Sequence, residues 1–203
     1  MSQIALPIDA REPGAEARVV VGNANRAVVD ALGTPKDWPF RTAVLIGPRR
    51  SGKTLLGRWF DASEGGDVID GADAWEEDAL FHRWNRSQET GRPLLLIGNA
   101  ENWEIALPDL GSRLGGSLQL RIGTPDDAMV AEMIAAHARQ RRLALGVGAA
   151  GYLVPRIERS FAAIERLVAE IDRLSLERQV PATMSVWRDA LEAIQGPEQA
   201  RLL

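Results

Sequence analysis

The sequence predicts an α/β domain with a short parallel sheet of about four or five strands, followed by an all-helical domain. Short apolar runs alternate with helical patterns up to about residue 120, which is typical of a parallel sheet covered by helices. A glycine-rich turn joins one of these runs directly to an amphipathic helix. Beyond residue 123 the strand pattern stops and only helical periodicity remains.

The strands of the α/β domain are expected at three apolar runs that end at glycine or polar residues, 42–46, 67–70 and 93–97. Helices are expected after the glycine-rich turn and over residues 75–88. The interval between the turn and the strand at 67–70 accommodates a single helix. P-loop proteins usually have a further strand and helix in this interval. Because a strand at the edge of the sheet can be lost without unpairing a central one, we expect a reduced sheet of about four strands.

The helical domain is expected to begin with Thr124 as the capping residue and Pro125 at the first helical position. Residues 160–178 repeat apolar side chains at three-and-four spacing, and residues 184–194 form a last amphipathic helix. These patterns divide the chain into a tail and linker (1–17), an α/β domain (18–123) and a helical domain (124–203).

The composition is that of an ordinary globular protein, with 45% hydrophobic and 26% charged residues. Its 24 Lys plus Arg and 28 Asp plus Glu give a formal charge of −4, which is not the basic field of a dedicated duplex-DNA binder. There is no cysteine, and two histidines are too few for a histidine-based metal cluster. No apolar stretch approaches the ~20 residues of a membrane span, so we expect no membrane segment and a cytoplasmic location.

Residues 47–54 match the phosphate-binding loop pattern, in which two glycines bracket four residues and Lys-Thr follows. The backbone N–H groups of such a loop converge on phosphate at a helix N-terminus. Lys53 would neutralise the β and γ phosphates and Thr54 would offer its hydroxyl to Mg²⁺. The pattern predicts a site for ADP or ATP with Mg²⁺, formed by Gly47, Pro48, Arg49, Arg50, Ser51, Gly52, Lys53 and Thr54. The two arginines either add phosphate contacts or are simply solvated.

An acid at the end of a neighbouring strand is also needed to hold Mg²⁺, and a second acid to orient the attacking water. Asp70 is the candidate for the first role, although it could instead cap the following segment. Gly71 stands where the second acid is expected. We therefore expect weak intrinsic hydrolysis, unless Asp73 takes the second role.

With these residues placed, the chain resembles the DnaA/Hda-type AAA+ ATPases, and most closely the regulatory Hda branch found in α-proteobacteria. The resemblance covers roughly residues 18–195. The border of the adenine pocket is resembled by residues 18–26, and the helix after the Walker B strand by residues 79–85. The sensor 1 strand is resembled by residues 94–99, box VII by residues 107–114 and the start of the sensor 2 helix by residues 156–161.

This resemblance implies an AAA+ core with a C-terminal helical lid. It implies that Val21 and Asn25 border the nucleotide base, and that Asn99 lies at sensor 1. Arg159 would point toward the nucleotide phosphates. Arg113 would be an arginine finger that acts in trans on ATP bound by a partner.

The resemblance also gives the N-terminal tail an interpretation, because Gln3-Ile4-Ala5-Leu6-Pro7-Ile8 looks like the hexapeptide with which Hda docks into the DNA polymerase sliding clamp (the β subunit). Gln3 would hydrogen-bond at the pocket rim while Leu6 and Ile8 fill apolar pockets. From the residues alone, a strand packed on the chain's own domain is an equally good interpretation of this segment.

The implied function is to promote hydrolysis of DnaA-bound ATP, from a position tethered to the clamp, and so to restrain replication initiation. No segment resembles the basic helix-turn-helix domain of DnaA, so we expect no sequence-specific DNA binding. Self-association is left open. Two alternatives remain: a self-sufficient ATPase motor such as a helicase loader, and a nucleotide-binding scaffold without a catalytic partner.

Overall fold

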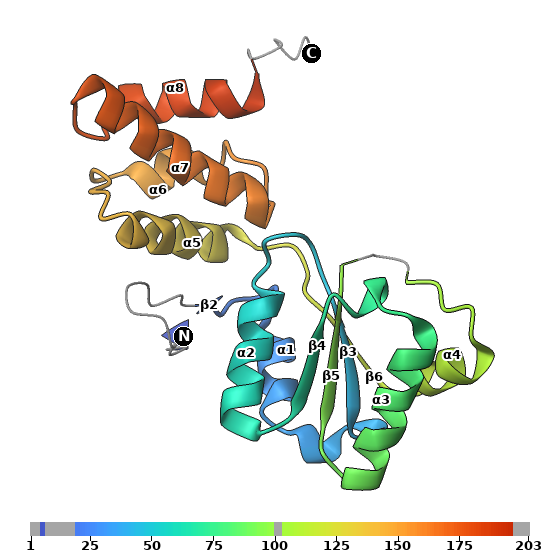
Figure 1. Cartoon of the computed structure of the whole chain (residues 1–203). Helices are drawn as coiled ribbons and strands as arrows, with labels where there is room; N and C mark the ends of the chain where they lie inside the picture. The colour runs from blue at the N-terminus through green and yellow to red at the C-terminus, as the bar shows by residue number, and fades with distance from the viewer. Residues whose placement is uncertain (1–4, 7–18, 100–102, 197–203) are drawn as a thin grey trace. The chain divides into compact units, whose positions relative to one another are not determined.

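The computed structural model describes residues 5–6, 19–99 and 103–196 (Figure 1). It forms two compact units, one containing the described residues up to Gly123 and the other beginning at Thr124. The expectations for Gln3, Ile4, Pro7 and Ile8 lie outside the described residues. None of the described helices is long and apolar enough to cross a bilayer.

A four-stranded parallel sheet in the order β4-β5-β3-β6 forms the centre of the first unit. Central strand β3 pairs with β5 and β6, and both β3 and β5 are almost wholly buried, as expected for strands covered on both faces. The strands are β3 (Thr42–Ile46), β4 (Asp67–Asp70), β5 (Leu94–Gly98) and β6 (Leu118–Arg121). The first three lie where the sequence predicts them, whereas β6 is not among the predicted strands.

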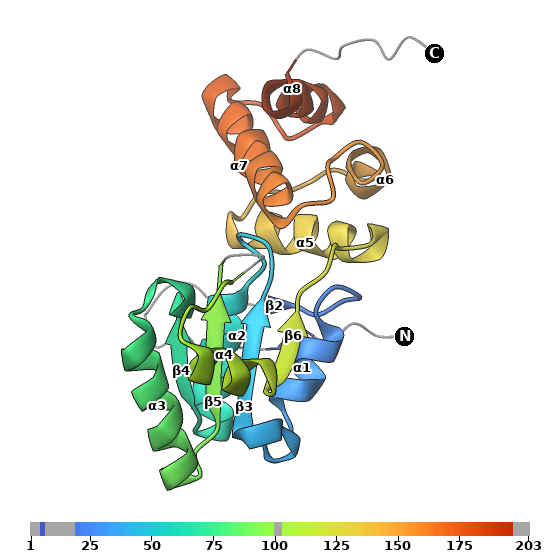
Figure 2. The ribbon, with the colours of Figure 1, turned by 90° about the vertical axis from the view of Figure 1, so that its right-hand side faces the viewer.

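Helices cover both faces of this sheet, with α1 and α2 on one side and α3 and α4 on the other (Figures 1 and 2). Their bounds are α1 (Arg26–Leu32), α2 (Lys53–Glu64), α3 (Glu77–Thr90) and α4 (Pro108–Gly115), with short 3₁₀ turns at Pro35–Asp37, Pro39–Arg41 and Ala72–Ala74. The parallel sheet between two helical layers confirms the predicted α/β fold class.

The connection from α2 to β4 consists of Gly65 and Gly66, and β4 is the edge of the sheet. Gly65 has φ +64° and ends α2 in the left-handed conformation that glycine favours. No strand or helix fits into so short a connection. The reduced sheet that the sequence predicts is therefore confirmed, with four strands.

The second unit consists of α5 (Asp127–Gln140), α6 (Ala149–Leu153), α7 (Phe161–Arg178) and α8 (Met184–Gln195). Helix α7 packs against both α5 and α8 through a buried stripe at three-and-four spacing, formed by Ile164, Leu167, Val168, Ile171 and Leu174.

The expected start of the first helix in this unit is wrong. Helix α5 begins at Asp127 rather than at Pro125, and its capping residue is Asp126, whose Oδ1 accepts from the Met129 backbone N–H at 2.8 Å. A carboxylate in the capping position satisfies one of the free N–H groups of the first turn. Thr124 and Pro125 therefore precede the helix.

Two short strands lie at the N-terminal side of the α/β unit. Strand β1 (Ala5–Leu6) pairs antiparallel with β2 (Val19–Val20). The paired residues are Ala5 with Val20 and Leu6 with Val19. Two residues of the hexapeptide thus form a strand on the chain's own domain, as in the second of the two interpretations that the sequence leaves open.

Candidate functional site

The glycine-rich loop connects the carboxyl end of β3 to the first turn of α2. Gly52 has φ +87°, in the left-handed region that favours glycine. A Cβ added to Gly47 would lie 2.8 Å from the Cβ of Ile122, closer than real contacts of this kind. Both positions therefore need glycine, one for its backbone conformation and the other for space. Pro48, Arg49 and Arg50 are exposed.

The side chain of Lys53 folds over this loop and is buried. Its ammonium donates to the carbonyl oxygens of Gly47 at 2.8 Å and Pro48 at 3.0 Å. Burial lowers the pKa of Lys53, and the nearby charges of Asp70 and Asp73 partly oppose this effect. Lys53, Gly47, Asp70 at the end of β4 and Asp73 just beyond it thus belong to one site.

Thr54 and Asp70 are in direct contact, with the threonine hydroxyl donating to Asp70 Oδ2 at 2.6 Å. Hydroxyl and carboxylate oxygens are ligands that Mg²⁺ accepts. Neighbouring oxygens around octahedral Mg²⁺ are about 2.9 Å apart, so this pair fits after opening by a few tenths of an ångström. Across the residues that the structure describes, no cluster of three metal-binding side chains occurs, and the remaining ligands would have to come from phosphate and water.

The Ser51 hydroxyl is a further polar group of the loop. The residue is buried, and within the described part of the chain its Oγ has no hydrogen-bond partner. Leaving a buried hydroxyl unpaired costs free energy. A phosphate oxygen in the loop would supply the missing partner.

Beyond Asp70 the chain turns through Gly71, which has φ +69°. A side chain in the place of the second acid would have to adopt this left-handed conformation. Asp73 lies nearby, and its Oδ2 accepts from the Asn99 backbone N–H at 3.0 Å. Asp73 therefore connects the ends of β4 and β5, and its charge acts on Lys53. Asn99 itself is exposed just after β5.

Strand β2 borders the loop and leads through a short turn into α1. Asn25 is buried, and its side chain accepts from the Gly22 N–H and donates to the Val20 carbonyl, both at 2.9 Å. Val21 is also buried. Val19 lies 3.7 Å from the position that a Cβ on Gly52 would take. Asn25 thus fixes the turn that follows β2.

Arg113 lies on α4 and contacts the facing side of α3. Its guanidinium carbon is 4.4 Å from the centre of the Phe81 ring and 4.5 Å from that of Trp84. One of its terminal N–H groups donates to Asn85 Oδ1. The side chain is half-buried in this arrangement. Sequence reasoning missed these three partners, although their spacing along α3 places them on one helix face.

The start of α4 is also attached to α3. Both carboxylate oxygens of Glu77 accept backbone N–H groups just before α4, from Ala106 at 2.8 Å and Leu107 at 2.5 Å. These are N–H groups that the helix cannot satisfy internally.

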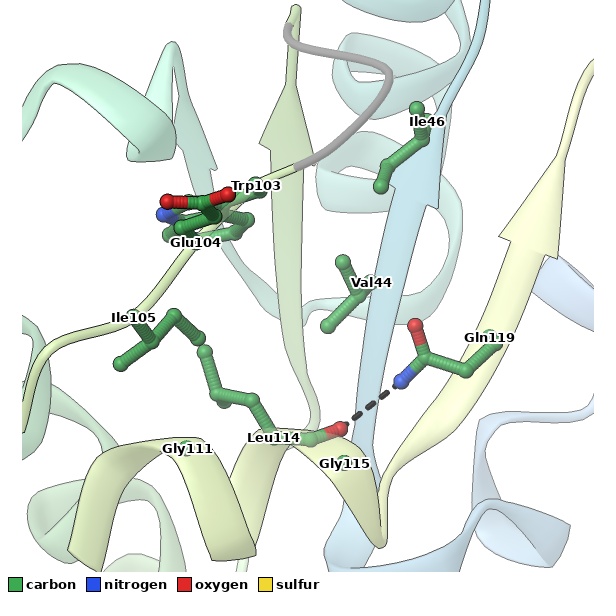
Figure 3. A pocket seen from close by; sticks show the side chains of 9 residues that line it. All are labelled: Val44, Ile46, Trp103, Glu104, Ile105, Gly111, Leu114, Gly115 and Gln119. Atoms are coloured by element: carbon green, nitrogen blue, oxygen red, sulfur yellow. Dashed lines mark hydrogen bonds between the residues drawn. The ribbon is translucent and has the colours of Figure 1, made fainter. Parts of the chain in front are cut away.

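The opposite side of α4 borders an open cavity of about 490 Å³ (Figure 3). Figure 3 shows β3 as its floor, α4 along the bottom of the view, β6 on the right and the segment before α4 on the left. The lining residues are Val44, Ile46, Trp103, Glu104, Ile105, Gly111, Leu114, Gly115 and Gln119. The Gln119 amide crosses toward α4 and donates to the Leu114 carbonyl at 2.8 Å.

Arg159 belongs to the second unit, where it precedes α7. It forms an ion pair with Asp127 at 2.7 Å, and both side chains are more than half exposed. Such an exposed pair contributes little to stability. Asp127 is in the first turn of α5, so the pair connects the starts of two helices of this unit.

The strand, glycine-rich loop and helix, with a threonine–carboxylate pair beside the loop, define a P-loop nucleotide-binding fold. No protein-family model matches the sequence. Among solved structures, domain III of the Thermotoga maritima replication initiation protein DnaA is similar, with a TM-score of 0.72 and 14% identity over 87% of this chain and 95% of that one.

Two further structures extend this comparison. AMPPCP-bound DnaA from Aquifex aeolicus has a TM-score of 0.59 and 19% identity over 79% of this chain and 66% of that one. The Thermotoga maritima RuvB Holliday junction branch migration motor has a TM-score of 0.61 and 15% identity over 85% of this chain and 70% of that one. The chain therefore has a DnaA-like AAA+ fold.

Proposed function

We propose that the chain binds ADP or ATP with Mg²⁺ in the loop formed by residues 47–54. The observation that carries this proposal is the contact between Thr54 and Asp70 beside the buried ammonium of Lys53. It places a cation and two oxygen ligands at the start of a helix, where the backbone also favours phosphate. When bound, Mg²⁺ would neutralise phosphate charge, and Thr54 and Asp70 would hold it.

Two further observations support a nucleotide ligand. The buried Ser51 hydroxyl has no partner among the described residues, and a phosphate oxygen would satisfy it. Among the described residues, Lys53 donates to two carbonyl oxygens of its own loop, which leaves the third N–H of its ammonium for a phosphate oxygen. The DnaA structures of the same fold that contain AMPPCP agree with this proposal.

Thermal unfolding with and without nucleotide tests the proposal. ATP with Mg²⁺ at one hundred times its dissociation constant should stabilise the folded protein by about 2.7 kcal/mol, or roughly 5–11 °C for a chain of this size. Lys53→Met should remove the shift with ADP and ATP, and Asp70→Asn should remove the part that depends on Mg²⁺. Asp78→Asn, at an exposed acid on α3, is the matched control. An unchanged shift in Lys53→Met would refute binding at this loop.

We further propose that this nucleotide-binding unit is a regulatory adaptor, which presents Arg113 to ATP bound by DnaA. An arginine supplied in trans stabilises transition-state charge and contributes about 10³–10⁵ in rate where it has been measured. Gly71 in place of a second acid argues for weak hydrolysis by this chain itself. The bound nucleotide would then serve mainly to order the protein around its loop.

The proposed tether to the sliding clamp is the segment from Gln3 to Ile8. A clamp pocket would take this segment as an extended peptide. Ala5 and Leu6 pair with β2 in the structure. Docking would therefore require this strand pair to open, so that the segment can bind the clamp instead. Two paired residues are a small barrier, since isolated short strand pairs are marginal.

Turnover of DnaA-bound ATP in the presence of clamp loaded on DNA tests the adaptor. The wild-type chain should accelerate it and Arg113→Ala should abolish the acceleration. A Gln3→Ala, Leu6→Ala double variant should lose acceleration and clamp binding together. Acceleration that survives Arg113→Ala would exclude the arginine-finger role, and clamp binding that survives the double change would exclude the tether.

A self-sufficient ATPase motor is the second candidate, favoured by one observation. Asp73 lies close enough to act electrostatically on Lys53 and is tied to the Asn99 backbone at the end of β5. It could therefore supply the acid that Gly71 does not. Steady hydrolysis by the purified chain, abolished by Asp73→Asn with nucleotide binding retained, would support the motor over the adaptor.

A further inference from the structure

Helix α4 is attached to α3 at both of its ends. Glu77 binds the two backbone N–H groups before α4, and Arg113 near its other end stacks on α3. On its opposite side, Gly111, Leu114 and Gly115 border the open cavity (Figure 3). Leu110 and Leu114 anchor the helix in the buried core, whereas the Arg113 side chain itself is held by its contacts with α3.

The contacts of the Arg113 guanidinium leave some of its N–H groups available to bind an anion. Phe81 and Trp84 contact the guanidinium at its carbon, and Asn85 accepts from one of its five N–H groups. Within the described residues, no other hydrogen bond or ion pair of the Arg113 side chain occurs. Stacking on a ring uses the face of the guanidinium and leaves its N–H edge able to bind an anion.

We propose that Phe81, Trp84 and Asn85 are positioning residues, which hold the Arg113 guanidinium in a fixed plane with its N–H edge ready for the phosphate of an ATP bound by a partner protein. This inference rests on the proposed adaptor function. It assigns to α3 the task of orienting a side chain that acts in another molecule's site.

Preorganisation is the physical reason for such an arrangement. An arginine side chain has many rotamers, and fixing it only when the partner binds would cost conformational entropy. A group that already has its working orientation pays less of this cost in the transition state. Loss of the stacking ring or of the amide acceptor should therefore reduce the maximal rate rather than the affinity between the two proteins.

Two pairs of variants separate ring stacking and hydrogen bonding from mere volume. Phe81→Leu removes the aromatic face, whereas Phe81→Tyr keeps it. Asn85→Ala removes the acceptor, whereas Asn85→Gln keeps an amide on a longer side chain. Phe81 and Asn85 are only half-buried, so both pairs can be made without opening the core at Trp84.

Turnover of DnaA-bound ATP should be measured against the concentration of the chain. Phe81→Leu and Asn85→Ala should lower the maximal rate by roughly 10-fold or more, with the half-saturating concentration unchanged. Phe81→Tyr should retain the wild-type rate and Asn85→Gln should recover part of it. Equal maximal rates in wild type and Phe81→Leu would overturn the inference.

A spectroscopic readout tests the positioning without any partner. In the free protein, the side-chain Nε–Hε signal of Arg113, assigned by its loss in Arg113→Lys, should be shifted by the aromatic rings. The shift should disappear in Phe81→Leu and persist in Phe81→Tyr. A signal at the position of a free arginine in the wild type would overturn the inference.

Different results would refute the adaptor function and the positioning role of α3. If Arg113→Ala accelerates DnaA-bound ATP turnover as well as the wild type, the adaptor's arginine-finger role fails, whatever the spectroscopic result. If Arg113→Ala is inactive but Phe81→Leu is fully active, the adaptor function stands and only the positioning role of α3 fails.

Discussion

Gly47→Ala is the substitution that most directly tests the construction of the loop. The added Cβ would lie 2.8 Å from the Cβ of Ile122 and 3.4 Å from the hydroxyl oxygen of Ser51. Ile122 is buried, and its backbone N–H donates to the Ile46 carbonyl at 2.9 Å. Neither partner can move freely, because one is tied to the sheet and the other lies in the loop itself.

The expected cost follows from this geometry. Carbon atoms pack best at about 3.5–4.0 Å, so the loop or the end of β6 must shift by several tenths of an ångström. Overpacking of this kind typically costs about 1–3 kcal/mol, which corresponds to a fall of roughly 2–12 °C in Tm for a chain of this size. The shift also moves backbone N–H groups that would contact phosphate, so nucleotide affinity should fall as well.

Thermal unfolding with and without ATP and Mg²⁺ measures both effects, and Gly151→Ala is the matched control. Gly151 lies within α6, and a Cβ there would meet nothing within 4 Å. Alanine at such a helix position should be neutral or stabilising by about 0.5–1 kcal/mol. Ile122→Val should not rescue Gly47→Ala, because valine keeps the Cβ that causes the clash.

A Gly47→Ala protein with wild-type Tm and a full nucleotide-induced shift would refute this reasoning, because it would show that the loop relaxes without cost. A lowered Tm with a full nucleotide shift would separate the two effects. It would mean that the loop keeps its phosphate-binding geometry and that the strain is taken up elsewhere.

Three further predictions concern stability. Burial lowers the pKa of His137, so the unfolded chain binds more protons than the folded protein just below the ordinary histidine pKa. The free energy of unfolding should therefore fall as the pH drops from 7 to 5. In thermal unfolding, His137→Gln should lose part of this pH dependence, whereas His82→Gln, at an exposed histidine, should keep it. Asp126→Ala removes the cap of α5 and should cost about 0.5–2 kcal/mol in urea unfolding, and an unchanged midpoint would contradict the assigned helix start. Phe60→Ala, at a fully buried ring stacked on Trp38, should cost about 3–5 kcal/mol in the same assay.

The strands that sequence reasoning found are those with continuous apolar runs. Residues 42–46 and 67–70 have the predicted bounds because glycine or polar residues end each run. Strand β6 was not predicted because apolar and polar residues alternate over only four positions, Leu118-Gln-Leu-Arg121, with Gln119 exposed. Four alternating residues are too few to distinguish a strand from a loop.

The start of α5 shows why local patterns can be ambiguous. Thr124 and Asp126 are both good capping residues, and the sequence offers no choice between them. In the structure, Gly123 donates to the Ala24 carbonyl at 2.9 Å, which holds the chain leaving β6 against the segment after β2. The helix therefore starts only after this connection, and Asp126 becomes the cap.

The loop could be predicted from its pattern, whereas the contact between Thr54 and Asp70 depends on tertiary structure. Because α2 leads into β4 through two glycines and packs against it, the first turn of the helix meets the end of the strand. Spacing along the chain suggests this arrangement but does not fix the 2.6 Å contact.

For Arg113, the sequence motif suggests a role but does not predict the contacts of the side chain. Its place in the sequence resembles that of an arginine finger, yet in the structure the side chain stacks on two rings of its own chain. The two roles are compatible, because the rings contact the face of the guanidinium and a phosphate would bind its edge. A purely structural arginine would need the same rings but would not need unpaired N–H groups. The maximal rate of the Phe81 variants, rather than their stability, therefore distinguishes the two roles.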